Sequence, residues 1–456
     1  MRRIKTLALI TTIALTLVPA TVLAKPSAVP AVDGLIHLSD SSATVSLGAT
    51  LGAEKVYVGD GSACAILSDH SMRCWGQDSY GQLGDGGEAA YGSDIKTTPV
   101  TVIGGHHWQT ADVASGSVCA ITTDGDLYCW GANDFGQLGS GTDGYLTSQT
   151  SPTRVGTDSD WLAVTGFSDT FCGVREGGSV WCWGYGSSGT IGDGDTTLRN
   201  VPTRVILSDD TPSSGFQAID AGLELNCGVT SDKSLYCWGY DVAGAIGASP
   251  SPETTITKAT QVGSDNVWES VGGGYRYACA LNISKEASCF GANPFGGLGD
   301  GTTDPKPLTA VSGSMHWDDV SAGVFHTCGI SSTNLYCWGQ NAEGQIDWVD
   351  SASTYTTPRE VAPDASWSDV DNGYVNTCGI TEGDVWCWGY NINGVLSDPD
   401  LTLSHSARWV FDGAALPTTT TDGGPVIPML IAATLLMAAG VYLRAARRTT
   451  TSASER

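Results

Sequence analysis

The sequence predicts an all-β fold, a seven-bladed β-propeller, with a signal peptide before it and one transmembrane helix after it. Three observations support this fold class. The 14 cysteines fall into seven pairs, and the first cysteines of successive pairs lie 49 to 55 residues apart. Around each pair, side chains alternate with the period of two that is typical of a β-strand. Glycine contributes 59 of 456 residues and charged residues only 15%, which suits short strands joined by tight turns.

Each repeat carries a hairpin followed by a glycine-rich motif. In the second repeat, turn residues 123–126 separate the two cysteines, residues 127–131 read Leu-Tyr-Cys-Trp-Gly, and residues 136–139 read Gly-Gln-Leu-Gly. We expect a small antiparallel sheet of four strands per repeat. Such a sheet cannot bury both of its faces alone, whereas a closed ring of sheets buries them and hides the edge strands. We interpret the tryptophans of Cys-Trp-Gly as packing between blades; the alternative is a stacking surface for sugars.

The same residues resemble a known family. The Trp-Gly of each Cys-Trp-Gly and the following Gly-Gln-Leu-Gly, as at residues 136–139, are similar to RCC1 repeats. The resemblance implies a seven-bladed propeller of RCC1 type over residues 55–412, here in a secreted or surface variant with disulfides. We also predict how the ring closes: residues 407–411, which follow the last repeat, pair into the first blade, because repeat one lacks the upstream strand that others have near Pro152 or Pro202.

The cysteine spacing predicts one disulfide within each repeat. Eight or nine residues separate the members of a pair, whereas zinc ribbons use two to four, so we predict no metal ligands here. Directly opposed residues of a hairpin come within disulfide range, and a secretory signal supplies an oxidising compartment. Free buried thiols are the alternative. The predicted pairs are Cys64–Cys74, Cys119–Cys129, Cys172–Cys182, Cys227–Cys237, Cys279–Cys289, Cys328–Cys337 and Cys378–Cys387.

The two ends of the chain predict its location. Residues 1–24 have basic residues, then an apolar stretch, then small residues at the cleavage positions, as in a secretory signal peptide. Residues 426–443 are apolar and uncharged, long enough to cross a bilayer as a helix. The basic residues of segment 444–456 follow at once, which predicts a cytoplasmic tail. Segment 25–54 precedes the propeller, and a Pro/Thr/Gly stalk, residues 413–425, leads to the helix.

Within that stalk, Leu416-Pro417-Thr418-Thr419 resembles a sortase sorting motif. The fifth residue is Thr420 where the sorting signal has glycine. We therefore predict a single-pass protein at the cell surface, and attachment to the cell wall is the alternative.

Charge and motif content restrict the function. The formal net charge is −26, so we exclude nucleic acid as a partner. No metalloprotease, serine-hydrolase or phosphate-binding motif is present, and we predict neither an enzyme nor a cofactor. We interpret His106 and His107 as structural or solvated residues rather than metal ligands. Gly-Asp-Gly recurs at residues 84–86, 192–194 and 299–301; it could offer carboxylates to calcium, but a turn explains it more simply.

The sequence thus favours a monomeric recognition module at the cell surface, in which loops on one propeller face bind a protein or glycan. The candidate contact loops are the longer and less repetitive connections Gly87–Thr98, Gly141–Ser151 and Leu207–Gly215. The alternative is an inhibitor of a secreted enzyme, since the resemblance extends to bacterial propellers that cap β-lactamases. A propeller enzyme is the third reading, which carboxylates or histidines clustered at the centre of the ring would favour.

Overall fold

The computed structural model describes residues 51–411 except 88–93, 145–146, 243–245, 247–252, 347–351, 392 and 398–402; of residues 403–408 and 411 it describes the backbone only. The predicted signal peptide, stalk, transmembrane helix, tail and Leu416–Thr419 motif lie outside these residues. Within the described part of the chain, no helix is long and apolar enough to cross a membrane.

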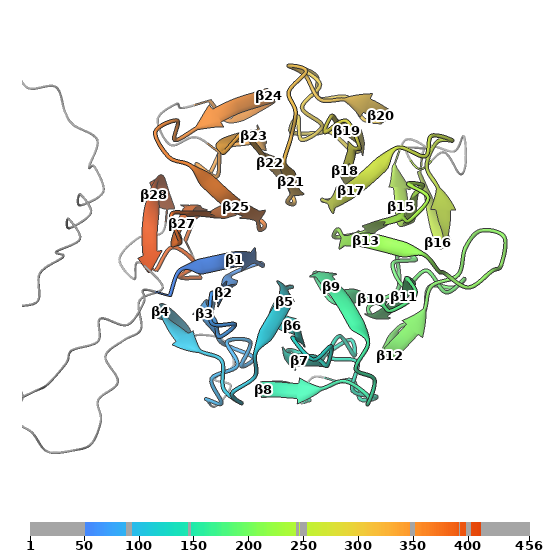
Figure 1. Ribbon diagram of the computed structural model, residues 1–456, viewed down its shortest axis with the longest axis vertical. Helices are drawn as coiled ribbons and strands as arrows, with labels where there is room; N and C mark the ends of the chain where they lie inside the picture. Colours follow the sequence, from blue (N-terminus) through green and yellow to red (C-terminus); the bar gives the residue numbers. More distant parts are fainter. Residues whose placement is uncertain are drawn as a thin grey trace, which may run out of the picture. The chain divides into compact units, whose positions relative to one another are not determined.

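The described residues form seven antiparallel sheets of four strands each, arranged as blades of a propeller (Figure 1). The strands run in chain order from the centre of the ring outward, as Figure 1 shows. Blades 1 and 2 comprise β1 (Ala53–Val58), β2 (Ser62–Leu67), β3 (Met72–Gln77), β4 (Ile95–Thr101), and β5 (Trp108–Val113), β6 (Ser117–Thr122), β7 (Leu127–Gly131), β8 (Gln149–Arg154). Blades 3 and 4 comprise β9 (Trp161–Phe167), β10 (Thr170–Arg175), β11 (Ser179–Gly184), β12 (Arg199–Arg204), and β13 (Phe216–Ala221), β14 (Leu225–Thr230), β15 (Leu235–Val242), β16 (Glu253–Gln261). Blades 5 to 7 comprise β17 (Trp268–Gly273), β18 (Tyr277–Asn282), β19 (Ala287–Gly291), β20 (Lys306–Ala310), then β21 (Asp319–Ala322), β22 (His326–Ser331), β23 (Asn334–Gln340), β24 (Thr354–Val361), and β25 (Trp367–Asn372), β26 (Asn376–Thr381), β27 (Asp384–Tyr390), β28 (Leu403–Phe411).

The predicted ring closure is wrong. Strand β28 pairs with β27 of its own blade, and the first blade already has four strands of its own. The prediction assigned each outer strand to the repeat that follows it in the chain. The segment around Pro152 follows the third strand of blade 2 and pairs with it as β8, so each outer strand belongs to the blade before it. No described strand of blade 7 pairs with blade 1. Side-chain contacts therefore join the two blades.

The hydrophobic core lies between successive blades. One buried cluster combines Cys64, Met72 and Leu83 of blade 1 with Trp108 and Trp130 of blade 2. Another combines residues of blades 1 and 7, so the same packing continues where the ring closes. Each blade therefore buries a face only when the neighbouring blade packs against it.

The tryptophans of Cys-Trp-Gly join neighbouring blades. In six blades, blade 1 included, the indole N–H donates to the carbonyl of the residue that follows the first glycine of the glycine-rich motif in the preceding blade, as from Trp130 to Gln82 at 2.9 Å. Trp75 donates to Val395 O at 2.7 Å and so joins blade 1 to blade 7. All six side chains are fully buried, which agrees with blade packing and leaves these rings no surface for a sugar.

The glycine of Cys-Trp-Gly is required by the backbone. Its φ is positive in all seven blades, for example +101° at Gly76 and +118° at Gly239, a region that only glycine adopts readily. A Cβ at Gly76 would lie 2.4 Å from Gly61 O, so the two backbones could not approach. The pairing register shifts just before this glycine, which bends the third strand toward the outer one.

Seven disulfides cross-link the second and third strands of the blades, with the pairing that the cysteine spacing predicts. The two cysteines are direct partners across each hairpin, as Cys64 is to Cys74, and their Cα atoms lie 4.0 to 4.1 Å apart. All 14 are buried in the inter-blade core.

Candidate functional site

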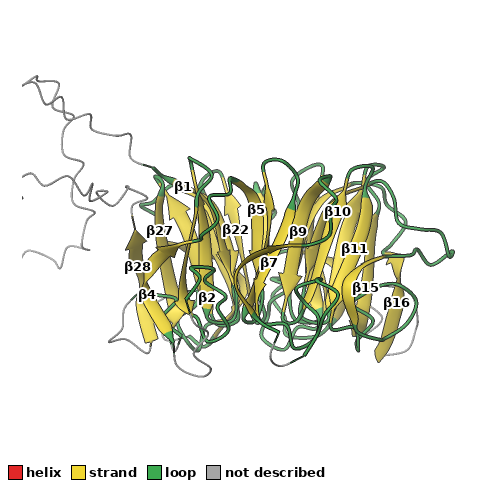
Figure 2. Ribbon diagram, turned by 90° about the horizontal axis from the view of Figure 1, so that it is seen from below, coloured by secondary structure: helices red, strands yellow, loops and turns green. Residues whose placement is uncertain are grey.

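The two faces of the propeller carry different loops, as the edge-on view in Figure 2 helps to follow. Because successive strands are antiparallel, the loops from first to second and from third to fourth strands lie on one face. We call this the aromatic face, for the rings described below. The predicted contact loops Gly87–Thr98 and Gly141–Ser151 follow third strands, so their described residues, which exclude 88–93 and 145–146, belong to it. Loop Leu207–Gly215 joins β12 to β13 and lies on the opposite face. The three loops therefore do not form one site.

Aromatic side chains gather on the aromatic face over blades 4 to 7. Phe325 is central: its ring lies 5.3 Å from Tyr374, 5.1 Å from Phe295 and 6.3 Å from Tyr275, each edge to face. The Arg276 guanidinium lies 4.9 Å from the Tyr275 ring. These side chains are half-buried, so they form a continuous and preorganised surface that still reaches solvent.

The aromatic surface extends to Tyr240 and has a second part over blades 2 and 3. Arg276 also covers the Tyr240 ring, at 4.5 Å. Phe135 and Tyr185 pack at 4.9 Å and are 37% and 44% exposed. Solvent-accessible rings of this kind are typical anchors of protein interfaces. Sequence reasoning missed them, although Phe135 and Phe295 recur six residues after the second cysteine of their repeats, and Tyr185 and Tyr240 recur three residues after it.

A cavity of about 340 Å³ opens on the same face between blades 1, 6 and 7. Its walls include Asp60 and Glu343, the rings of Tyr374 and Tyr390, and the amide of Asn376. A second cavity, of about 470 Å³, lies on the opposite face between blades 3 and 4, beside the exposed Leu162 and the buried Phe216. The first cavity continues the aromatic surface, since Tyr374 belongs to both.

Three aspartates at the inner rim of the ring join neighbouring blades. Asp112 accepts a hydrogen bond from the backbone N–H of Gly166 at 2.8 Å, and Asp220 accepts one from Gly273 at 2.8 Å. Asp371 accepts one from Val58 at 2.7 Å, across the closure of the ring. Each aspartate is the direct strand partner of the first cysteine in its blade. The residue seven positions before that cysteine was therefore a signal available in the sequence.

The other carboxylate oxygens of these aspartates are also hydrogen-bonded. Asp220 accepts from the Thr165 hydroxyl at 2.6 Å, Asp371 from the Ser321 hydroxyl at 3.1 Å, and Asp112 from its neighbour's N–H at 2.8 Å. Carboxylates do cluster at the centre of the ring, the feature that would favour an enzyme. Their oxygens, however, are engaged in holding blades together, and the arrangement supports a structural role.

Burial changes the protonation of this rim. It raises the pKa of Asp112 to about 7 and that of Asp220 to about 6, with nearby carboxylates adding to both. The pKa of Asp371 is also raised, by burial and then by Asp112. Between about pH 4 and 7 the folded state thus keeps protons that the unfolded chain has released, so these groups make stability fall as the pH rises. Buried His326, with its pKa lowered to about 3, acts in the opposite direction, mainly below its ordinary value of 6.5.

We therefore expect the free energy of unfolding to fall by about 1–2 kcal/mol between about pH 6.5 and pH 8, where the opposing contribution of His326 is only about 0.4 kcal/mol. Denaturant titrations followed by circular dichroism at the two pH values measure this change. In the variant Asp112→Asn, the decrease in the free energy of unfolding between the two pH values should be smaller. An unchanged or larger fall in that variant would contradict the assignment to the rim.

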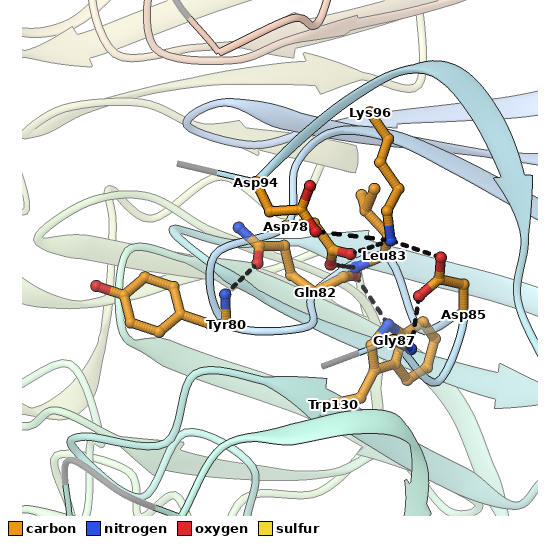
Figure 3. A network of polar contacts seen from close by, with 9 residues as sticks. All are labelled: Asp78, Tyr80, Gln82, Leu83, Asp85, Gly87, Asp94, Lys96 and Trp130. Carbon is orange, nitrogen blue, oxygen red and sulfur yellow. Dashed lines mark hydrogen bonds and ion pairs between the residues drawn. The ribbon is translucent and has the colours of Figure 1, made fainter. Parts of the chain in front are cut away.

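The Gly-Asp-Gly motifs form ion pairs rather than open carboxylate sites. Lys96 Nζ lies 2.6 Å from both Asp85 and Asp78, as Figure 3 shows. In the other two motifs Asp193 pairs with Arg199 at 2.5 Å and Asp300 with Lys306 at 2.6 Å. Among the described residues, no group of three or more histidine, cysteine or acidic side chains is placed to hold a metal ion. The turn interpretation therefore fits this geometry better than calcium.

The adjacent histidines of the second repeat are packed against other rings. The His106 ring lies 4.3 Å from Tyr128 and 5.2 Å from Trp108. His107 faces His70 at 6.4 Å. The structure thus places His106 in an aromatic contact, as a structural role requires.

Fold and surface together define a propeller whose rigid, cross-linked ring presents one aromatic face. Within this class, the Regulator of chromosome condensation (RCC1) repeat matches residues 124–174 and 177–227, and a second form of the repeat matches 54–82 and 317–345. RCC1 repeats are thus present in the chain, and every blade of its propeller contains a disulfide.

Two relatives are similar in sequence to about three fifths of the chain. The chain is 28% identical to the ultraviolet-B receptor UVR8 of Arabidopsis thaliana over 279 residues, which is 60% of this chain and 61% of UVR8. It is 25% identical to the human E3 ubiquitin-protein ligase HERC2 over 61% of this chain but 6% of HERC2. It thus spans about three fifths of the first relative and a small part of the second.

Solved structures share the fold. Yeast RCC1 (Prp20), in a crystal structure with Kap60 bound, aligns with a TM-score of 0.61 at 19% identity over 70% of this chain and 77% of that chain. Human WBSCR16 aligns with a TM-score of 0.62 at 17% identity over 74% and 92%. At this identity the likeness concerns the fold alone.

Proposed function

We propose that this propeller is a recognition module on the outside of a cell, held there by residues 426–443, and that its aromatic face binds a protein partner. The observation that carries the proposal is the half-buried cluster of Tyr275, Phe295, Phe325 and Tyr374. The rings hold one another edge to face, so little conformational entropy is lost when a partner covers them. Seven buried disulfides support an oxidising compartment.

A protein partner is favoured over a glycan by the way the rings pack. Sugars stack on flat, separately exposed ring faces, whereas Phe325 receives the edges of its neighbours and forms one continuous apolar patch. Asp60 and Glu343 line the cavity beside Tyr374 at one side of the patch, whereas Glu224 is paired with Arg276. The complementary partner presents apolar anchors among basic side chains, and the propeller acts on it by binding, as a monomer and without catalysis.

The test is capture of the partner by the full-length chain, displayed on cells and cross-linked, with Phe325→Ala as the variant. Loss of this central ring should weaken capture roughly thirtyfold, the effect of a hot spot of about 2 kcal/mol. Leu162→Ala removes an exposed apolar side chain from the opposite face, where Leu162 is 52% exposed, and should leave capture unchanged.

The reverse pattern, loss with Leu162→Ala and none with Phe325→Ala, would assign binding to the opposite face and refute the proposal. If the captured protein is an enzyme that loses its activity on binding, the function is inhibition. Capture of a glycan without any protein would also contradict the proposal.

A further inference from the structure

Arg276 stands at the edge of the aromatic surface and is held from three sides. Its guanidinium lies 4.5 Å from the Tyr240 ring and 4.9 Å from the Tyr275 ring, and its Nε donates to the Glu224 carboxylate. All four residues belong to the aromatic face, because they stand in loops from first to second strands or near the end of a third strand. The side chain is therefore fixed before a partner arrives, and little rotamer entropy is lost on binding.

The two terminal nitrogens of this guanidinium are open. Only Nε has an acceptor among the described residues, and the Arg276 side chain is 30% exposed. Arg175 on the opposite face provides a contrast. Its guanidinium also lies 5.4 Å from each of two tryptophan rings, but its Nε and Nη1 pair with Asp160 and Asp158 at 2.7 and 3.0 Å. Arg276 therefore keeps unused N–H groups in the planar fork that binds a carboxylate through two parallel hydrogen bonds.

The backbone of Arg276 supplies an independent indication. Its φ is +56°, in the left-handed region that a residue with a Cβ adopts only at a cost in free energy. The equivalent residue, three positions before the first cysteine of the repeat, is Gly61 in blade 1 and Gly116 in blade 2, with φ of +120° and +84°. Glycine would form such a loop without strain, so folding of the loop does not require an arginine. Strained residues are concentrated at sites that bind ligands or partners.

We propose that Arg276 binds the carboxylate of an aspartate or glutamate side chain of the bound protein through its two terminal nitrogens. The inference rests on the proposed function and names the chemistry of one of its contacts. A phosphate group is less suited, because its second negative charge would meet Glu224 beside the same guanidinium. Since Asp60 and Glu343 lie at the other side of the patch, the aromatic face offers a basic contact at one end and acidic contacts at the other. This charge pattern fixes the direction in which the partner lies on the face.

The experiment measures the binding of two blocked dipeptides to the full-length chain by titration calorimetry at low ionic strength. N-acetyl-Phe-Glu amide carries a ring beside one carboxylate, and N-acetyl-Phe-Gln amide has nearly the same shape without the charge. The glutamate probe should bind at least about tenfold more tightly than the glutamine probe, a difference of about 1.4 kcal/mol. Equal affinities of the two probes would overturn the inference.

Three variants assign the preference to Arg276. In Arg276→Gly the two probes should bind equally, because the group that distinguishes them is gone. Arg276→Lys keeps the charge without the planar fork, and the preference for the glutamate probe should fall several-fold. Arg175→Gln removes a guanidinium that is also stacked on rings but is paired, on the opposite face; it is the matched control and should leave the preference unchanged.

Thermal unfolding verifies that the variants fold. Glycine adopts the φ of residue 276 without strain, so the unfolding midpoint of Arg276→Gly should lie within a few degrees of that of the unmodified chain. A tenfold preference that persists in Arg276→Gly would assign the carboxylate contact to another residue and refute the inference. If Arg276→Gly does not fold, an undiminished preference in Arg276→Lys refutes it instead.

Failure of this inference is distinguishable from failure of the proposed function. If Phe325→Ala abolishes capture of the partner while the two probes bind equally, recognition by the aromatic face stands and the carboxylate contact fails. If the glutamate probe is preferred as described while Phe325→Ala leaves capture intact, Arg276 binds carboxylates but not that of the captured protein, and the inference falls together with the proposed function.

Discussion

A chain that is refolded with its cysteines kept reduced is expected not to regain the native fold. Each disulfide closes a loop of about ten residues, which stabilises the folded state by about 2–3 kcal/mol. Seven such loops together reach or exceed the whole net stability of an ordinary domain, about 5–15 kcal/mol. The hairpins they close are also the two central strands of every blade.

The measurement is near-ultraviolet circular dichroism after dilution from denaturant, with and without dithiothreitol. The oxidised chain in the same buffer is the control. Reductant added without denaturant should have little effect, because all 14 cysteines are buried. A single pair replaced as Cys119→Ala with Cys129→Ala should cost about 2–3 kcal/mol and leave the fold intact. Recovery of the native spectrum by the reduced chain would contradict this account.

Replacing Trp75 by alanine is expected to lower the free energy of unfolding by about 4–5 kcal/mol, since a large buried ring and one buried hydrogen bond are lost together. Trp75 is fully buried in the cluster shared by blades 1 and 7, and its N–H donates to Val395 O. Because no strand crosses the closure, blades 1 and 7 are held together by packing and side-chain contacts of this kind, among them the hydrogen bond from Val58 to Asp371. We expect loss of this contact to separate blades 1 and 7 before any other pair of neighbouring blades.

Guanidinium titrations followed by far-ultraviolet circular dichroism give the free energies. Trp75→Phe keeps most of the packing and should cost only about 1–2 kcal/mol, the value of the hydrogen bond. The chain itself has Phe290 at the equivalent position of blade 5. Trp409→Ala, at a side chain 51% exposed, is the control and should cost under about 0.5 kcal/mol. Equal costs for Trp75→Ala and Trp409→Ala would show that closure does not depend on this contact.

The residues that sequence reasoning missed share one property. Asp112, Asp220 and Asp371 act through hydrogen bonds to the next blade, and Phe325 contacts rings from three loops of two other repeats. Inside a single repeat each of these is an ordinary polar or aromatic side chain. Only the packing of blades against one another brings the partners of these residues into contact.

The sequence by itself determined the number of blades, the hairpin in each and the partner of every cysteine. These features are local: alternation with a period of two and a pair of opposed cysteines are contained within about a dozen residues. The tertiary structure alone decided to which blade each outer strand belongs, how blade 1 meets blade 7, and which loops share a face. Asp371 and Val58, which meet across the closure, are 313 residues apart in the chain. Contacts of that kind exist only after the ring has closed, because the closed geometry, and no pattern along the chain, sets the distance between them.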